Sequence, residues 1–263
     1  SDTPSAVHAL NGKFYVARNN VGALGGISII SFIDDNAIAL NASSSYPYNT
    51  DIGSRNSGSG YNATAYNATY KIVHHNTNDI HVAVIDNKTY VAVATDGGVS
   101  VINEDDETVV DIHDIANSNW DPSSEIYILE DGTLYFTTEA SATSSEHLSV
   151  YYRIQDLKSD ITVQLQNNAI IHYLRSDGLS YWSNIVSVFN YTEAEKKSIN
   201  SIYVTPDTSF IDGSSNTIYV ATDIGVSVIS EKQGDESNGA VKYYTQDYIT
   251  EEMIGDISGM WPF

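Results

Sequence analysis

Cysteine is absent from this sequence, and basic residues and long apolar runs are scarce. Without cysteine there is no disulfide framework and no thiolate metal site. The 12 Lys and Arg residues face 34 Asp and Glu residues, which gives a formal net charge of -22 at pH 7. This charge repels nucleic acid phosphates and anionic lipid headgroups, so we expect no nucleic acid partner. No run approaches the roughly 18 apolar residues of a membrane helix, so we expect no membrane insertion.

What the sequence does have is enough apolar material for a core, since 41% of its 263 residues are hydrophobic. The chain opens at Ser1 without Met, so we expect either a removed leader or a fragment. Five N-x-[ST] sequons suit a glycoprotein that is secreted or sits at the cell surface, although a chain rich in Asn, Ser and Thr also makes sequons by chance. The sequons begin at Asn41, Asn62, Asn67, Asn87 and Asn190. We predict an extracellular or cell-surface location.

One segment occurs twice. YVAVATDGGVSVI, residues 90–102, returns almost unchanged as IYVATDIGVSVI, residues 218–229. Each copy has two apolar runs around a Thr-Asp-x-Gly turn, which is the pattern of two β-strands joined by a tight hairpin. We expect the turn glycines to adopt positive φ and the turn aspartates to hydrogen-bond the turn backbone. These residues are Gly97, Gly98, Gly225, Asp96 and Asp223.

Looser copies of this hairpin occupy residues 13–30, 133–152 and 179–189. Except for a longer first interval, the turns recur every 40–50 residues or so, the length of a four-stranded propeller blade. A short strand precedes each copy and a weaker one follows it, as in an up-and-down antiparallel sheet. We therefore predict an all-β fold, a single β-propeller domain over residues 1–263. It has five countable four-stranded blades and a Ser/Tyr/Asn-rich insertion at about 41–70. Residues 253–263 either start a partial sixth blade or supply a closing strand to the first.

The YVATD-x-GVSVI core, with GDISGM near the C-terminus, resembles the repeat of two-component-regulator-type β-propellers. The resemblance runs from about Val7 to the C-terminus, and two copies match well. The copy at 179–189 lacks the turn glycine, and the copy at 133–152 lacks both the aspartate and the glycine. The resemblance implies a propeller and, loosely, a sensory or carbohydrate-associated extracellular domain. Its motif residues form turns, so it implies no catalytic residue.

In an up-and-down blade the turn between the second and third strands lies on the same face as the link to the next blade. We expect this face to gather a polar ring, with His74 and His75 beside three predicted ligand-binding residues: His113, Asp114 and Trp120. Carboxylates from the turns are candidate calcium ligands, because Ca²⁺ takes six to eight oxygens. They are Asp96, Glu139 and Asp223. The sequence has no calcium-loop motif, and we expect no required cofactor.

Tyrosine is abundant, with 19 residues, and several lie among small polar residues in the insertion. Tyr beside Ser, Asn and Gly is typical of recognition surfaces and suits stacking on sugar rings or contact with a protein. The predicted ligand-binding tyrosines are Tyr46, Tyr48, Tyr61 and Tyr66.

These patterns favour a non-catalytic binding or interaction module whose partner is a protein or glycan at a surface, with self-assembly into a homo-oligomer or filament as a variant. One alternative is a carbohydrate-active hydrolase or lyase that uses two carboxylates of the turn face. Its candidates are Asp114, Asp121, Glu139 and Asp223, although 34 acids make such a pair by chance. A second alternative is the sensor domain of a larger signalling protein.

Overall fold

The computed structural model describes residues 3–19, 25–48, 53, 65–113, 122–140, 145–151, 153–162, 171–174, 180–182, 199–207, 215–222, 225–232, 235–245 and 261–262. Within these residues the regular structure is almost entirely β-strand, accompanied by one 3-10 helix, η1 (Ile154–Asp156). No helix of the described residues has the length and apolar character needed to cross a membrane. The all-β prediction is confirmed.

The described strands form four five-stranded sheets, and the first and last are simple antiparallel meanders. Sheet 1 consists of β1 (Thr3–Leu10), β2 (Lys13–Asn19), β3 (Gly26–Ser31), β4 (Asn36–Leu40) and β5 (Ser45–Tyr48). Sheet 4 consists of β16 (Ile199–Asp207), β17 (Ser215–Thr222), β18 (Gly225–Lys232), β19 (Asp235–Thr245) and β20 (Trp261–Pro262).

The two middle sheets begin as meanders and then each gains a parallel strand. Sheet 2 consists of β6 (Thr77–Ile85), β7 (Lys88–Thr95), β8 (Gly98–Asn103), β9 (Thr108–His113) and β13 (Ile161–Thr162), with β13 parallel to β9. Sheet 3 consists of β10 (Ile126–Ile128), β11 (Leu134–Ala140), β12 (Ser145–Tyr151), β14 (Ile171–Leu174) and β15 (Ser180–Trp182), with β14 parallel to β12.

The repeated Thr-Asp-x-Gly turn is a hairpin, as predicted, but its hydrogen bonds come from a different residue. Thr95 Oγ1 accepts from the Gly97 N–H at 3.1 Å and donates to the Gly98 carbonyl at 2.8 Å. In the second copy Thr222 Oγ1 donates to the Gly225 carbonyl at 3.2 Å. Gly98 and Gly225 adopt the expected positive φ, +112° and +151°, whereas Gly97 does not. The threonine side chain therefore makes the turn hydrogen bonds that were predicted for Asp96. The Asp96 carboxylate bonds to asparagine side chains instead.

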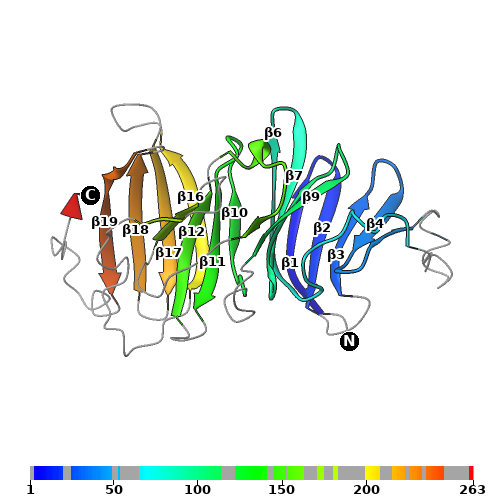
Figure 1. Cartoon of the computed structure of the whole chain (residues 1–263), viewed down its shortest axis with the longest axis horizontal. Helices are drawn as coiled ribbons and strands as arrows, with labels where there is room; N and C mark the ends of the chain where they lie inside the picture. The colour runs from blue at the N-terminus through cyan, green and yellow to red at the C-terminus, as the bar shows by residue number, and fades with distance from the viewer. Residues whose placement is uncertain are drawn as a thin grey trace.

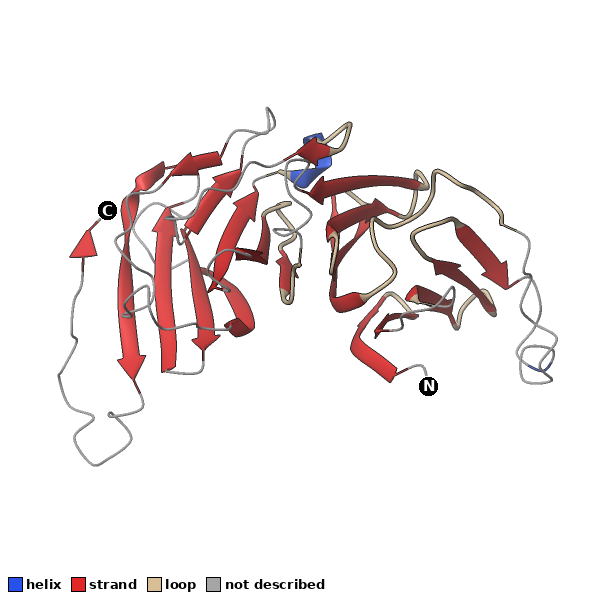
Figure 2. Ribbon diagram, turned by 60° about the horizontal axis from the view of Figure 1, so that its bottom comes forward, coloured by secondary structure: helices blue, strands red, loops and turns tan. Residues whose placement is uncertain are grey.

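The four sheets follow one another along an arc, with sheet 1 and sheet 4 at its opposite ends (Figures 1 and 2). The first strand of each sheet contacts the first strand of the next, in the order β1, β6, β10, β16. First strands therefore line the inner side of the arc, and later strands of each sheet lie farther out. Radial sheets with first strands innermost are the arrangement expected of propeller blades.

Each neighbouring pair of sheets shares one apolar core. Tyr15 and Ile27 of sheet 1 pack with Val91 and Val93 of sheet 2. The other face of sheet 2 packs on sheet 3, and the far face of sheet 3 packs on sheet 4. Because the strands alternate apolar side chains on both faces, a middle sheet is buried on both sides.

The predicted fourth repeat differs most from expectation. Its described residues are β14 and β15, which join sheet 3 as its fourth and fifth strands. The repeat lacks the turn glycine of the other hairpins, and β14 instead pairs with the open edge of β12. The described strands thus make four sheets where five blades were counted, and the number of blades remains a prediction.

The insertion predicted at about 41–70 begins inside sheet 1. Residues 45–48 form β5 on the outer edge of that sheet, and Ser45 makes an antiparallel bridge with Asn67. Asn41 closes the preceding turn, because its Oδ1 accepts from the backbone N–H groups of Ser43 and Ser44. β5 thus ends at Tyr48, and the chain pairs with it again at Asn67; residues 65–70 are named the returning segment.

Candidate functional site

Asp96, a predicted calcium ligand, is held by amide side chains. Its Oδ2 accepts from Asn76 Nδ2 at 2.9 Å and its Oδ1 from Asn78 Nδ2 at 3.0 Å. The Asn78 amide also donates to the Ser123 carbonyl, at the entry to sheet 3. The carboxylate of Asp96 thus ties the β7–β8 turn to the link before β6 and to the next sheet.

Two of the predicted histidines flank the same turn. A Cβ on Gly97 would lie 2.8 Å from the Cβ of His74, and a Cβ on Gly98 would lie 3.1 Å from the Cβ of His113. His75 stacks on His74 with ring centroids 4.3 Å apart. The topological argument therefore placed Asp96, His74 and His113 together correctly.

The rest of the predicted ring is less complete. Asp114, Trp120 and Asp223 lie outside the described residues, as does the alternative acid Asp121. Glu139 is on β11, where its backbone pairs with Glu146. Within the described part of the chain no group of three or more His, Asp or Glu side chains could hold a metal ion. Calcium binding and carboxylate catalysis remain predictions.

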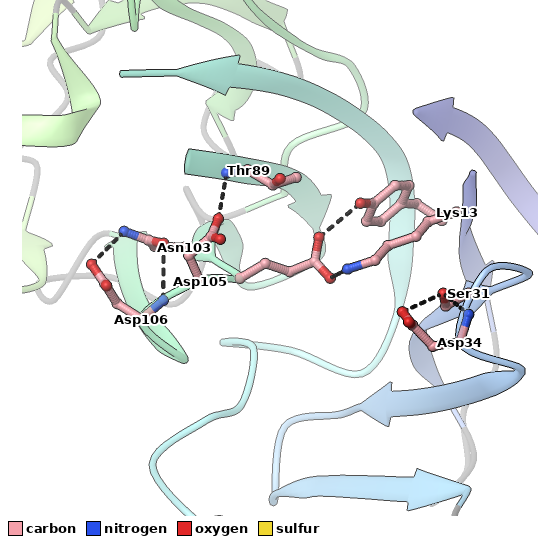
Figure 3. Close-up of polar contacts among 9 residues, drawn as sticks. Lys13, Ser31, Asp34, Thr89, Asn103, Asp105 and Asp106 are labelled. Atoms are coloured by element: carbon pink, nitrogen blue, oxygen red, sulfur yellow. Dashed lines mark hydrogen bonds and ion pairs between the residues drawn. The ribbon is translucent and has the colours of Figure 1, made fainter. Parts of the chain in front are cut away.

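A second polar network lies at the opposite end of the strands of sheets 1 and 2, beside the β8–β9 turn (Figure 3). Glu104 joins the sheets, since its two oxygens contact Lys13 Nζ at 2.6 Å and Tyr15 Oη at 2.7 Å. Asp105 accepts from the Thr89 N–H, and Asp106 accepts from Asn103 Nδ2. Three acids of the hairpin NEDDET (residues 103–108), namely Glu104, Asp105 and Asp106, therefore make structural contacts.

The described predicted tyrosines lie on β5 and in the segment that pairs with it, where the Tyr66 N–H donates to the Ser45 carbonyl. Tyr46 and Tyr48 are on β5, opposite Ala39 and Ala37 of β4. Tyr66 is 60% exposed in the returning segment. Tyr61 lies outside the described residues.

Among the sequons, Asn87 is exposed on the β6–β7 turn, whereas Asn41 is buried and Asn67 partly exposed. Asn62 and Asn190 are not among the described residues. Asn87 is therefore the described sequon with the most accessible side chain.

A row of rings on the inner strands was not anticipated. His8 on β1, His81 on β6, Tyr127 on β10 and Tyr203 on β16 follow one another through the four sheets. Successive ring centroids are 4.5, 4.0 and 5.8 Å apart. Each ring retains some exposure, and Tyr203 is 56% exposed. These four residues are named the ring row.

The ring row exists because the first strands share one register. In β1, β6 and β16 a bulge near the start of the strand precedes the ring by a few residues. The ring then pairs with the same position of the second strand: His8 with Tyr15, Tyr127 with Tyr135, and Tyr203 with Tyr219.

The ring row is uncharged at neutral pH. Burial lowers the pKa of His81 to about 4, and the neighbouring His8 adds to the shift. Burial also lowers the pKa of His8 and raises the pKa of Tyr127. Both imidazoles are therefore neutral, and the row consists of partly exposed, uncharged rings with polar edges on a strongly acidic protein.

Comparison with known proteins finds no matching family model and no matching curated protein. Solved structures do match over most of this chain. The extracellular domain of a putative hybrid two component system from B. thetaiotaomicron matches at a TM-score of 0.38 and 12% identity, over 92% of this chain and 34% of that one. The Dos1 propeller matches at a TM-score of 0.42 and 13% identity, over 94% of this chain and 59% of that one.

The major Malassezia sympodialis allergen Mala s 1 matches at a TM-score of 0.39 and 10% identity, over 94% of this chain and 65% of that one. The chain thus spans less than two thirds of each of these three proteins. TM-scores below 0.5 do not establish a common fold, so the arrangement described above rests on this chain's own strand pairings and sheet contacts.

Proposed function

We propose that this chain is a non-catalytic recognition module of the β-propeller type that binds a neutral carbohydrate along the ring row. The main observation behind the proposal is that the first strand of each sheet contributes one ring, and that these rings lie in contact at equivalent positions. Aromatic faces stack on the apolar faces of sugar rings, and a series of rings suits a ligand with repeating units.

Charge supports a neutral ligand. The chain has a formal net charge of -22, which repels polyanionic glycans and acidic peptides. The ring row adds no charge of its own at neutral pH, because burial keeps His8 and His81 unprotonated. A neutral oligosaccharide therefore approaches without an electrostatic penalty.

The carboxylates near the inner strands have structural hydrogen bonds. Asp79 Oδ1 accepts from the Ile80 N–H, and its Oδ2 accepts from the Ile126 N–H at 3.0 Å. Asp96 is held by two amides. Both carboxylates thus connect neighbouring elements, which supports a structural use of them.

The module belongs, in this proposal, to the two-component-regulator-type propellers and acts outside the cell. The turn motif and the exposed sequon at Asn87 support both points. Treatment of the secreted chain with an N-glycosidase tests the location: a mass loss that Asn87→Gln removes is expected.

Calorimetric titration with cellohexaose, xylohexaose and maltohexaose tests the binding site. Tyr127→Leu removes a ring from the middle of the row while keeping apolar volume, and should weaken binding about tenfold, the value of one stacking contact. Tyr127→Phe keeps the ring and should retain most of the affinity. Tyr66→Ala, in the returning segment, is the matched control and should bind as the wild type does.

Two outcomes overturn the proposal. The carbohydrate assignment fails when none of the three oligosaccharides binds. The site assignment fails when Tyr66→Ala loses binding and Tyr127→Leu does not, which moves recognition to the insertion.

A further inference from the structure

The outer face of sheet 1, turned away from sheet 2, is mainly apolar, with Arg18 donating to Ser28 at one end. Residues directly opposite in antiparallel strands share a face. Two rows of such residues cross all five strands of sheet 1. They are Val7, Val16, Ser28, Ala39 and Tyr46, and then Ala9, Phe14, Ile30, Ala37 and Tyr48. Val7 is 57% exposed and Phe14 42% exposed. These ten residues are named end face 1.

The outer face of sheet 4, turned away from sheet 3, is similar. Pairing across β16, β17 and β18 again gives two rows. They are Ser201, Ala221 and Val226, and then Tyr203, Tyr219 and Val228. Tyr203, Tyr219 and Val226 are among the exposed large hydrophobic residues of the chain. These six residues are named end face 2.

The equivalent positions inside the arc are interfaces. Register aligns Phe14 and Val16 of end face 1 with Val91 and Val93 of sheet 2. Those valines are fully buried against sheet 1. End face 1 therefore has the same kinds of residues as the face of sheet 2 that packs against sheet 1.

End face 2 matches the opposite kind of surface. The repeat aligns Val226 and Val228 with Val99 and Val101, which are buried in the core that sheet 2 shares with sheet 3. The two end faces of one chain are thus the two halves of an interface that the arc already uses three times.

The named rows lack acidic residues. None of the sixteen positions of end face 1 and end face 2 is Asp or Glu, and protein interfaces are depleted of these residues.

We propose that end face 2 of one copy of this chain packs on end face 1 of a second copy, in the way that each sheet packs on the next. The contact is heterologous, so repeating it closes a ring or extends a filament. It also continues the ring row, by placing His8 of one copy after Tyr203 of the other.

Sedimentation velocity over a concentration series, in salt that screens the acidic surface, tests the contact. The wild-type chain should sediment as a multiple of the single chain. Phe14→Lys on end face 1 and Tyr219→Lys on end face 2 should each sediment as single chains. Lysine lowers the net negative charge, so general repulsion cannot explain the loss. Ile33→Lys, on the exposed β3–β4 turn outside both faces, is the matched control and should associate normally.

Mixing the two variants gives the sharpest test. The Phe14→Lys chain keeps end face 2 and the Tyr219→Lys chain keeps end face 1, so the mixture should form dimers that neither variant forms alone. Where a lysine variant fails to fold, Val7→Thr and Val226→Thr, which keep the β-branched shape, replace it and should weaken association at least tenfold.

A wild-type chain that remains monomeric throughout the series overturns the proposal, as expected when a further sheet of the same polypeptide covers the faces. Association that Phe14→Lys abolishes and Tyr219→Lys leaves intact also overturns it, because a symmetric contact between two copies of end face 1 would then hold the particle together.

Discussion

The hairpins β7–β8 and β17–β18 have nearly the same sequence but different surroundings. On one face the two are alike, because Val93 and Val220 are both fully buried. On the other face Val99 is fully buried under sheet 3, whereas its counterpart Val226 is 38% exposed. The repeat therefore encodes a strand pair with two apolar faces, and the neighbouring sheets decide how many of them are buried.

The largest difference in stability between the two hairpins should come from a charge at Val99 or Val226, on the face that is buried in one hairpin and exposed in the other. Val99→Asp places an unpaired carboxylate between sheets 2 and 3 and should lower the free energy of unfolding by about 4 kcal/mol. Val226→Asp should cost less than about 1 kcal/mol, since water reaches that position. Urea unfolding of monomeric samples measures both. Equal losses would mean that end face 2 is covered within the single chain.

The turns should show a smaller difference. At Gly98 φ is +112° and a Cβ would lie 2.4 Å from the Ile112 carbonyl oxygen, so Gly98→Ala should cost about 3 kcal/mol. At Gly225 φ is +151°, nearer to extended backbone, and Gly225→Ala should cost about 1 kcal/mol. Melting temperatures of the two variants against wild type provide the comparison. A larger shift for Gly225→Ala would contradict it.

The first strands differ in pH dependence, because His81 of β6 is replaced by Tyr203 in β16. The pKa of His81 is about 4 in the folded chain and 6.5 when unfolded. Between pH 6.5 and pH 4 the imidazole is protonated in the unfolded chain but not in the folded chain. His81 therefore hardly changes the free energy of unfolding above pH 6.5 and lowers it progressively as pH falls below that value. Its share should reach about 2 kcal/mol between pH 7 and pH 5.

His81→Phe keeps a ring and removes the titration. The free energy of unfolding of this variant should fall less between pH 7 and pH 5 than that of wild type, by the same amount. Tyr203→Phe changes no titrating group in this range and is the control. Parallel pH profiles for wild type and His81→Phe would show that the imidazole is solvated in the folded chain.

Sequence pattern predicted the features that depend on near neighbours. Alternation of apolar residues and a Thr-Asp-x-Gly turn were sufficient for the hairpins, since both elements lie within a dozen residues. The position of His74 and His113 beside Asp96 followed from the topology of a meander.

Features set by packing between sheets were not predictable in this way. The bonds from Asn76 and Asn78 to Asp96 depend on how the link before β6 crosses the turn. The ring row depends on contact between four first strands. The parallel pairing of β14 with β12 joins segments whose sequences carry no signal for each other.

The short strand β13 has a consequence for how this chain is made. Residues 161–162 complete sheet 2 by pairing with β9, after β10 to β12 of sheet 3 have been formed in chain order. During synthesis, β9 therefore remains an unpaired edge until Ile161 has left the ribosome, and such edges are sites of mispairing. Because β13 follows sheet 3 in the chain but pairs with sheet 2, the two sheets form one cooperative unit. If the backbone were cut between β9 and β10, the pairing of β13 with β9 would still hold sheet 2 and sheet 3 together.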